Sequence, residues 1–120
     1  ADIRSLINQA KTYVSQTINQ QMTLLYWSIG KRIRQEVLLE GRADYGQQVI
    51  ISLGKSLSAE YGSGFERSNL LRMVQFYDCF PDSDIVATLS RQLTWSHIKI
   101  LLPLKDKSAR EFYALMSGQN

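Results

Sequence analysis

The sequence has few of the residues that form disulfides, metal sites or membrane spans. Its one cysteine, Cys79, excludes a disulfide within the chain, and we expect it to be a buried, reduced thiol. Its one histidine, His97, has no cysteine or second histidine at metal-ligand spacing, which argues against a zinc site. No stretch approaches the ~18 uninterrupted apolar residues of a membrane span, and no signal-peptide pattern is present. These absences favour a cytoplasmic protein without a metal, a cofactor or a membrane partner.

The chain also lacks the alternating apolar–polar pattern of strands, and it has no internal repeat or low-complexity tract. Its 120 residues, 44% hydrophobic and 21% charged, are typical of one ordinary globular domain. We therefore predict a single all-α domain over residues 1–120. It should contain a long helix over 1–40, a helix-turn-helix-like pair over 45–80 and short helices over 84–118. The net charge of +3 leans towards an anionic partner without demanding one.

The first third of the chain carries one apolar stripe. Apolar residues step by three or four from Ile3 to Val37 without a proline, which predicts a helix of about 37 residues, ~55 Å long. A compact domain of this size is only about 35 Å across. Either the helix breaks at Gly30, or its protruding half packs on another copy or another domain. We favour the second, because Gly30 costs a helix only ~1 kcal/mol and would let another helix approach closely. We expect a homo-oligomer through this helix, with partner contacts at Ile7, Val14, Ile18, Trp27 and Ile29.

The central stretch is typical of a helix, a glycine turn and a second helix. The first helix is expected over 47–61 and the second over 66–80, with Gly62 in a left-handed conformation and Gly64 as a second permissive position. This is the helix-turn-helix pattern, whose second helix can lie in a DNA major groove. Polar side chains of that helix are types that contact phosphates and base edges. The candidate nucleic-acid-binding residues are Arg67, Ser68, Asn69, Arg72, Gln75 and Lys55, with Lys31 and Arg34 extending the basic surface.

Capping residues set the remaining boundaries. Asp44 is expected to cap the second helix, and Thr94 a short helix that ends around Pro103. Pro81 stops the chain after Phe80, a short helix is expected over 85–91, and a last one opens at Asp106 or Ser108.

Several segments together resemble the N-terminal domain of the YhcG family of bacterial proteins. They are Leu25-Tyr26-Trp27-Ser28-Ile29-Gly30-Lys31, Tyr45-Gly46, Gly62-Ser63-Gly64-Phe65, Asn69-Leu70, Arg72-Met73, Phe76-Tyr77, Leu93-Thr94-Trp95-Ser96-His97 and Ala109-Arg110-Glu111-Phe112-Tyr113. In that family an all-helical region precedes a C-terminal PD-(D/E)XK nuclease-like domain. The resemblance implies that this chain is a fragment, with that domain as a partner. The family often has Ser where this chain has Glu66; Ser63 and Glu66 show capping-box spacing instead, so the second helix is expected to start earlier.

The residues themselves predict no catalysis. No lysine has an acidic residue two positions before it, and we interpret Pro81-Asp82 as a helix stop rather than half of a nuclease motif. The alternative is a nucleophile and base pair formed by Cys79 and His97; a buried thiol and a histidine in the first turn of a helix are the ordinary interpretation. Two functions remain open. One is a DNA-binding and oligomerisation module that delivers a nuclease-like domain. The other is a protein-interaction domain, in which Leu71, Phe76, Trp27 and the N-terminal stripe contact another copy, the C-terminal domain or a third protein.

Overall fold

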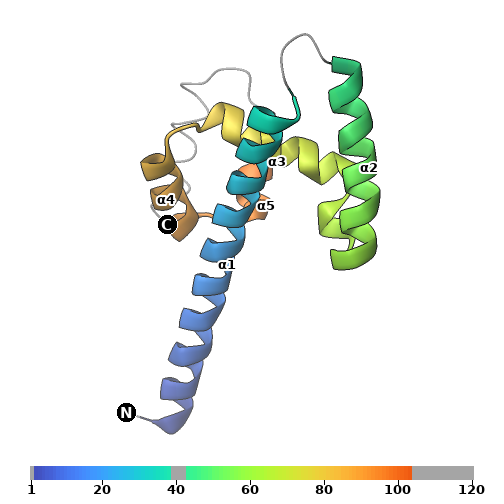
Figure 1. Ribbon diagram of the computed structural model, residues 1–120. Coiled ribbons are helices and arrows are strands. Elements are labelled where there is room, and N and C mark those ends of the chain that lie inside the picture. Colours follow the sequence, from blue (N-terminus) through green and yellow to red (C-terminus); the bar gives the residue numbers. More distant parts are fainter. Residues whose placement is uncertain (1, 39–42, 104–120) are drawn as a thin grey trace. The chain divides into compact units, whose positions relative to one another are not determined.

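A computed structural model describes residues 2–38 and 43–103, and all the regular structure in these ranges is helical (Figure 1). The helices are α1 (Ile3–Glu36), α2 (Ala43–Tyr61), α3 (Arg67–Cys79), α4 (Ser83–Gln92) and α5 (Trp95–Leu101), with a 3-10 turn, η1 (Ser63–Phe65), between α2 and α3. The predicted all-α class and the long N-terminal helix are confirmed. The helix predicted from Asp106 or Ser108 lies outside the described residues.

Helix α1 is a single helix of 34 residues, and Gly30 does not break it. It ends at Glu36, short of the predicted Glu40, and the N–H groups of both Val37 and Leu38 then donate to the Ile33 carbonyl oxygen at 2.9 Å. The backbone groups into two compact units, one of residues 26–81 and the other of residues 1–25 together with 82–120. Helix α1 therefore contributes residues to both units.

The unit of residues 26–81 is built around α2 and α3, and its core consists of the apolar side chains at helical spacing. Ile50, Leu70, Met73 and Phe76 are fully buried. Gly30 explains how α1 takes part, because a Cβ at Gly30 would overlap the Met73 carbonyl group and lie 2.9 Å from Val74 N. The expectation that this glycine lets another helix approach closely is confirmed, and the approaching helix is α3 of the same chain.

The turn between α2 and α3 follows the predicted pattern at Gly62 and departs from it nearby. Gly62 has φ 103° and ψ −177°, and its N–H donates to the Ser58 carbonyl oxygen at 2.9 Å. Gly62 alone among the described residues has a positive φ, so Gly64 does not use its freedom. The earlier start expected from Ser63 is wrong, because Ser63 opens η1 and the N-cap of α3 is Glu66, in extended conformation with φ −69° and ψ 162°.

The boundary of α2 also differs from the prediction. The helix already includes Ala43, so Asp44 is not its cap but lies in its first turn. There the carboxylate favours the helix through the partial positive charge of the N-terminal N–H groups.

The second unit contains α4 and α5, whose starts depend on side-chain caps. The Asp82 carboxylate accepts from the Asp84 N–H at 2.8 Å, so Asp82 acts as a helix start after Pro81. Thr94 caps α5 as predicted, forming a reciprocal capping box with His97. The buried residues of these two helices are Val86, Leu89, Ser90, Ile98 and Leu101.

Candidate nucleic-acid interface

Helix α3 has one buried side and one exposed side. Leu70, Met73, Val74 and Phe76 are buried, whereas Arg67, Ser68, Arg72 and Gln75 are exposed and Asn69 is half-buried. In Figure 1, α3 runs across α2 rather than alongside it, as the second helix of a helix-turn-helix does. The polar side of α3 therefore faces away from the core of its own unit.

The candidate residues on α3 do not all share one line. At about 100° per residue, Ser68, Arg72 and Gln75 lie within roughly 60° of one another. Arg67 and Asn69 lie on opposite flanks of this line. We call Ser68, Arg72 and Gln75 the polar line of α3. It is the set that one groove of nucleic acid could contact at the same time.

Lys55 and Arg67 meet at the junction of α2 and α3. Together with Ile51, Gly54, Ser58 and Glu66 they line one surface pocket. The junction is close because Gly54 has no side chain: a Cβ there would lie 2.9 Å from Arg67 N and 3.3 Å from Arg67 Cβ. Lys55 and Arg67 thus form a second basic position, and the acidic residue Glu66 lines the same pocket.

The basic cluster near the end of α1 is largely engaged within the chain. Arg34 donates two hydrogen bonds to the Asp78 carboxylate, the one from Nε at 3.0 Å. Arg32 pairs with Glu36 at 3.2 Å, and Lys31 Nζ lies 5.4 Å from the centre of the Trp27 ring. The hydrogen bond to Asp78 is the main cause that raises the pKa of Arg34 above its usual value. A phosphate at Arg34 would have to compete with Asp78.

The residues predicted to contact a partner divide into two groups. Ile7, Val14 and Ile18 are exposed, at 49%, 54% and 56%, and Ile29 is half-buried. Trp27 is only 8% exposed, and its indole is engaged within the chain by Phe80 and Tyr77.

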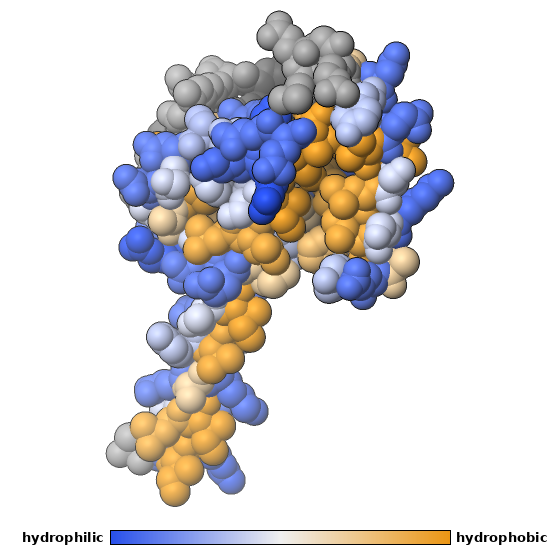
Figure 2. All heavy atoms as spheres, viewed as in Figure 1, coloured by the Kyte–Doolittle hydropathy of each residue, from blue (hydrophilic) through white to orange (hydrophobic). Residues whose placement is uncertain are grey.

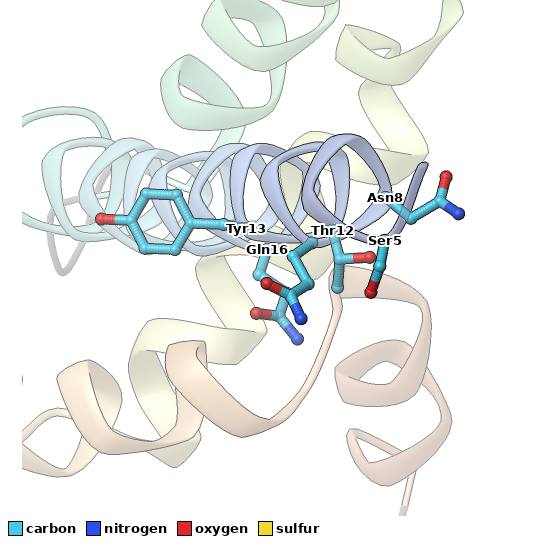
Figure 3. Close-up of a pocket in the computed structure, with 6 residues that line it drawn as sticks. Ser5, Asn8, Thr12, Tyr13 and Gln16 are labelled. Carbon is cyan, nitrogen blue, oxygen red and sulfur yellow. The ribbon is translucent and has the colours of Figure 1, made fainter. Parts of the chain in front are cut away.

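One surface depression and the metal-ligating side chains of the described residues bear on small-molecule and metal chemistry. A surface depression on α1 is lined by Ser5, Asn8, Gln9, Thr12, Tyr13 and Gln16 (Figure 3). All of them come from one helix and all are exposed, so the depression is not a cleft between elements.

Within residues 2–38 and 43–103, no three Asp, Glu, His or Cys side chains are grouped so that they could hold a metal ion. Cys79 is half-buried rather than fully buried. None of the helices in these ranges is both long and apolar enough to cross a membrane.

Comparison with known proteins identifies the family. The family described as "DUF1016 N-terminal domain" matches residues 2–120, nearly the whole chain. The chain belongs to this family. It is also 40% identical over 90 residues, 74% of this chain, to the Escherichia coli (strain K12) protein named "Putative nuclease YhcG". The match covers 24% of that relative, so the chain corresponds to about a quarter of it. No solved structure matches. The resemblance to the N-terminal domain of the YhcG family is thereby confirmed.

Two features of this family member escaped the sequence analysis. The first is the approach of α3 to Gly54, for which the only signal was a glycine inside a helical pattern. The second is the Arg34–Asp78 pair, which joins positions 44 residues apart. Spacing along the chain gives no indication of such a pair.

Proposed function

We propose that this chain is a non-catalytic, DNA-binding and self-associating part of a longer protein of its family. The observation that carries the DNA-binding half is the polar line of α3: Ser68, Arg72 and Gln75 lie together on the exposed side of a helix whose other side is fixed in a core. The relative's printed name, "Putative nuclease YhcG", adds support, because a nuclease must be held on nucleic acid.

Each residue has a role suited to its chemistry. Arg72 contacts a phosphate or the edge of a guanine, Gln75 a base edge and Ser68 a phosphate. Arg67 and Lys55, at the α2–α3 junction, neutralise neighbouring phosphates, while Asn69 on the other flank reaches a base edge. Lys31 and Arg34 contribute little, because Asp78 and the Trp27 ring already engage them.

The test measures binding of the chain to a labelled duplex and to a branched DNA at two salt concentrations. Arg72→Ala should weaken binding by about 1–3 kcal/mol, and the salt dependence should become shallower. Arg91→Ala is the matched control, because it removes the same charge from an exposed position on α4 and should leave binding nearly unchanged. No binding at low salt, or equal losses in both variants, would contradict the DNA-binding half.

The exposed apolar residues of α1 favour the self-association half, and they also suit the alternative of a protein-interaction domain without DNA contact. Sedimentation at micromolar concentration should show more than one copy of the chain. Apolar association should persist as salt rises, whereas DNA binding should fall steeply. A monomer at these concentrations would refute self-association and leave the DNA-binding half standing on its own measurement.

A further inference from the structure

The N-terminal part of α1 carries a large apolar side that no described residue covers. Every residue from Asp2 to Asn19 is exposed, and Figure 2 shows apolar side chains gathered along one side of this part of the helix. Seven large apolar side chains of α1 each expose 44–72% of their surface. They are Ile3, Leu6, Ile7, Tyr13, Val14, Ile18 and Leu25. We call these residues the α1 stripe.

The α1 stripe is distinct from the side of the helix that is buried within the chain. At about 100° per residue, its seven residues fall within roughly 140° of the circumference. Thr23 and Gly30, which are buried, fall on the roughly opposite side, and the buried Trp27 lies between them and the edge of the stripe at Tyr13. The stripe is therefore a separate contact surface. An apolar strip of this size on a soluble protein marks an interaction site.

The area and the shape of the stripe fit another helix. Seven side chains that expose about half of their surface amount to several hundred Å², which is the order of the ~800 Å² that each partner buries in a standard interface. The stripe runs along one helix without a cavity, so a second helix with the same pattern is its natural complement. A second copy of α1 supplies such a helix.

The charges of α1 favour an antiparallel arrangement of two copies. Between Ile3 and Gly30 the only charged residues are Arg4 and Lys11, so the segment from Thr12 to Gly30 is uncharged. In a parallel pair two copies of Arg4 and two of Lys11 would lie in the same half of the pair, with only the two Asp2 carboxylates to offset them and with partial positive charge at both helix N-termini. In an antiparallel pair the two Arg4 residues lie near opposite ends, each Lys11 stays on its own side of the centre, and each N-terminus lies beside the partner's uncharged half.

Side-chain sizes favour the same arrangement and set its register. A parallel pair in register would place Ala10 against Ala10 and leave a gap. An antiparallel pair centred on Val14 places Ala10 against Ile18 and Ile3 against Leu25. The small Ala10 then faces the larger Ile18, and the first residue of the stripe faces the last, so the whole stripe is covered on both helices.

We propose that a second copy of this chain covers the α1 stripe as an antiparallel helix, with the two Val14 residues facing each other across a two-fold axis. This inference rests on the self-association proposed above and adds to it the surface, the direction and the register.

The test is disulfide cross-linking in a Cys79→Ser background, with mild oxidation at micromolar concentration. Val14→Cys should yield covalent dimers at least tenfold faster than Ile7→Cys, which is about equally exposed in the single chain. The reason is that the two copies of position 7 would lie about 21 Å apart along the axis at 1.5 Å per residue, too far for a disulfide. Equal cross-linking at both positions would overturn the antiparallel direction, and faster cross-linking of Ala10→Cys than of Val14→Cys would overturn the register.

A second measurement keeps the test independent of substitutions within the stripe. A spin label on Ser5→Cys, also with Cys79→Ser, lies on the polar side of α1. Two such labels should be offset by roughly 27 Å along the axis in the antiparallel pair and not offset in a parallel one.

Sedimentation of the unaltered chain separates the self-association proposed above from this inference about its direction and register. A monomer overturns self-association and this inference together, whereas a dimer with the parallel distance overturns this inference alone.

Discussion

The indole Nε1–H of Trp27 donates a 2.7 Å hydrogen bond to the backbone carbonyl oxygen of Phe80. Phe80 is the C-cap residue of α3, and the carbonyl groups at the end of a helix have no partner within it. Trp27 and Phe80 are only 8% and 4% exposed, so water does not readily replace this bond. The bond therefore joins α1 to the end of α3 and satisfies a carbonyl that would otherwise be buried without a partner.

Trp27→Phe should reduce the free energy of unfolding by about 1–3 kcal/mol, because it leaves the buried Phe80 carbonyl unsatisfied and shrinks the packed ring. Urea unfolding followed by circular dichroism measures the change. Tyr61→Phe is the control, because it removes only the hydroxyl of a ring that is 63% exposed. If both variants lose equally little stability, the hydrogen bond does not contribute as stated.

Gly30→Ala should destabilise the chain by several kcal/mol. The added methyl group would overlap the backbone carbonyl of Met73. Because this carbonyl belongs to the backbone of α3, the overlap is relieved only if α3 moves away from α1. Thermal unfolding measures the loss. Gly64→Ala is the matched control, since nothing lies within 4 Å of its Cβ and its φ is not positive. That variant should be neutral, or more stable by up to ~1 kcal/mol through the reduced freedom of the unfolded chain. A wild-type melting temperature for Gly30→Ala would show that the two helices are not in contact there.

Thr94→Ala should cost about 1 kcal/mol, because Thr94 Oγ1 accepts the His97 N–H at the start of α5. Urea unfolding followed by circular dichroism measures this loss of stability. Ser96→Ala, at an exposed position of the same helix, should change stability by less than about 0.5 kcal/mol. Equal effects would mean that the cap contributes nothing beyond the loss of a hydroxyl.

The Arg34–Asp78 pair should contribute at most ~1 kcal/mol, since the two side chains are 42% and 39% exposed and solvent screens their attraction. A double-mutant cycle with Arg34→Met and Asp78→Asn measures the coupling, which should shrink in 1 M salt. Arg32 and Glu36, 77% and 60% exposed, form the comparison pair and should couple more weakly. A larger coupling for Arg32 and Glu36 would contradict the expected effect of burial.

The raised pKa of Arg34 should not make stability depend on pH near neutrality. A cation whose pKa rises on folding stabilises fully below its unfolded pKa, and loses that contribution only as the pH rises through its folded pKa. For Arg34 this window lies entirely above the ordinary arginine pKa, because the hydrogen bond to Asp78 raises the pKa further, so it lies far from neutrality. Stability between pH 6 and 9 should therefore be the same in wild type and in Arg34→Met, apart from a constant offset.

Several helix boundaries were predicted well because the residues that set them are close in sequence to the boundary. The positive φ of Gly62, Pro81 after Phe80 and the Thr94 cap each act within one turn of the chain. The bounds of α3 consequently came within a residue at each end, Arg67–Cys79 against a predicted 66–80. Ser63 misled the prediction, since capping-box spacing does not distinguish an α-helix from the 3-10 turn that precedes it here.

Which side of a helix meets which partner was harder to predict. The apolar residues predicted on one side of α1 from Ile3 to Ile33 are spaced by about 3.75 residues on average. An α-helix has 3.6 residues per turn, so this series winds around the helix by roughly 120° over that length. Trp27 is not one of these steps, and at thirteen residues after Val14 it lies about 140° around the helix from it, although both were predicted to contact one partner. On α3 the polar residues were predicted as one set, but Arg67 and Asn69 lie on the flanks of the polar line.

The exposure of every residue from Asp2 to Asn19 has an energetic consequence. A helical segment that buries so little surface against the described residues gains little stability from packing, and such a segment is only marginally stable in water. Its amide hydrogens should exchange almost as fast as those of a free helical peptide when the chain is dilute, and become protected as copies associate. Helix formation and assembly would then be one coupled equilibrium, with a heat-capacity change larger than rigid docking would give. Protein concentration would in that case control the folding of the first turns of α1.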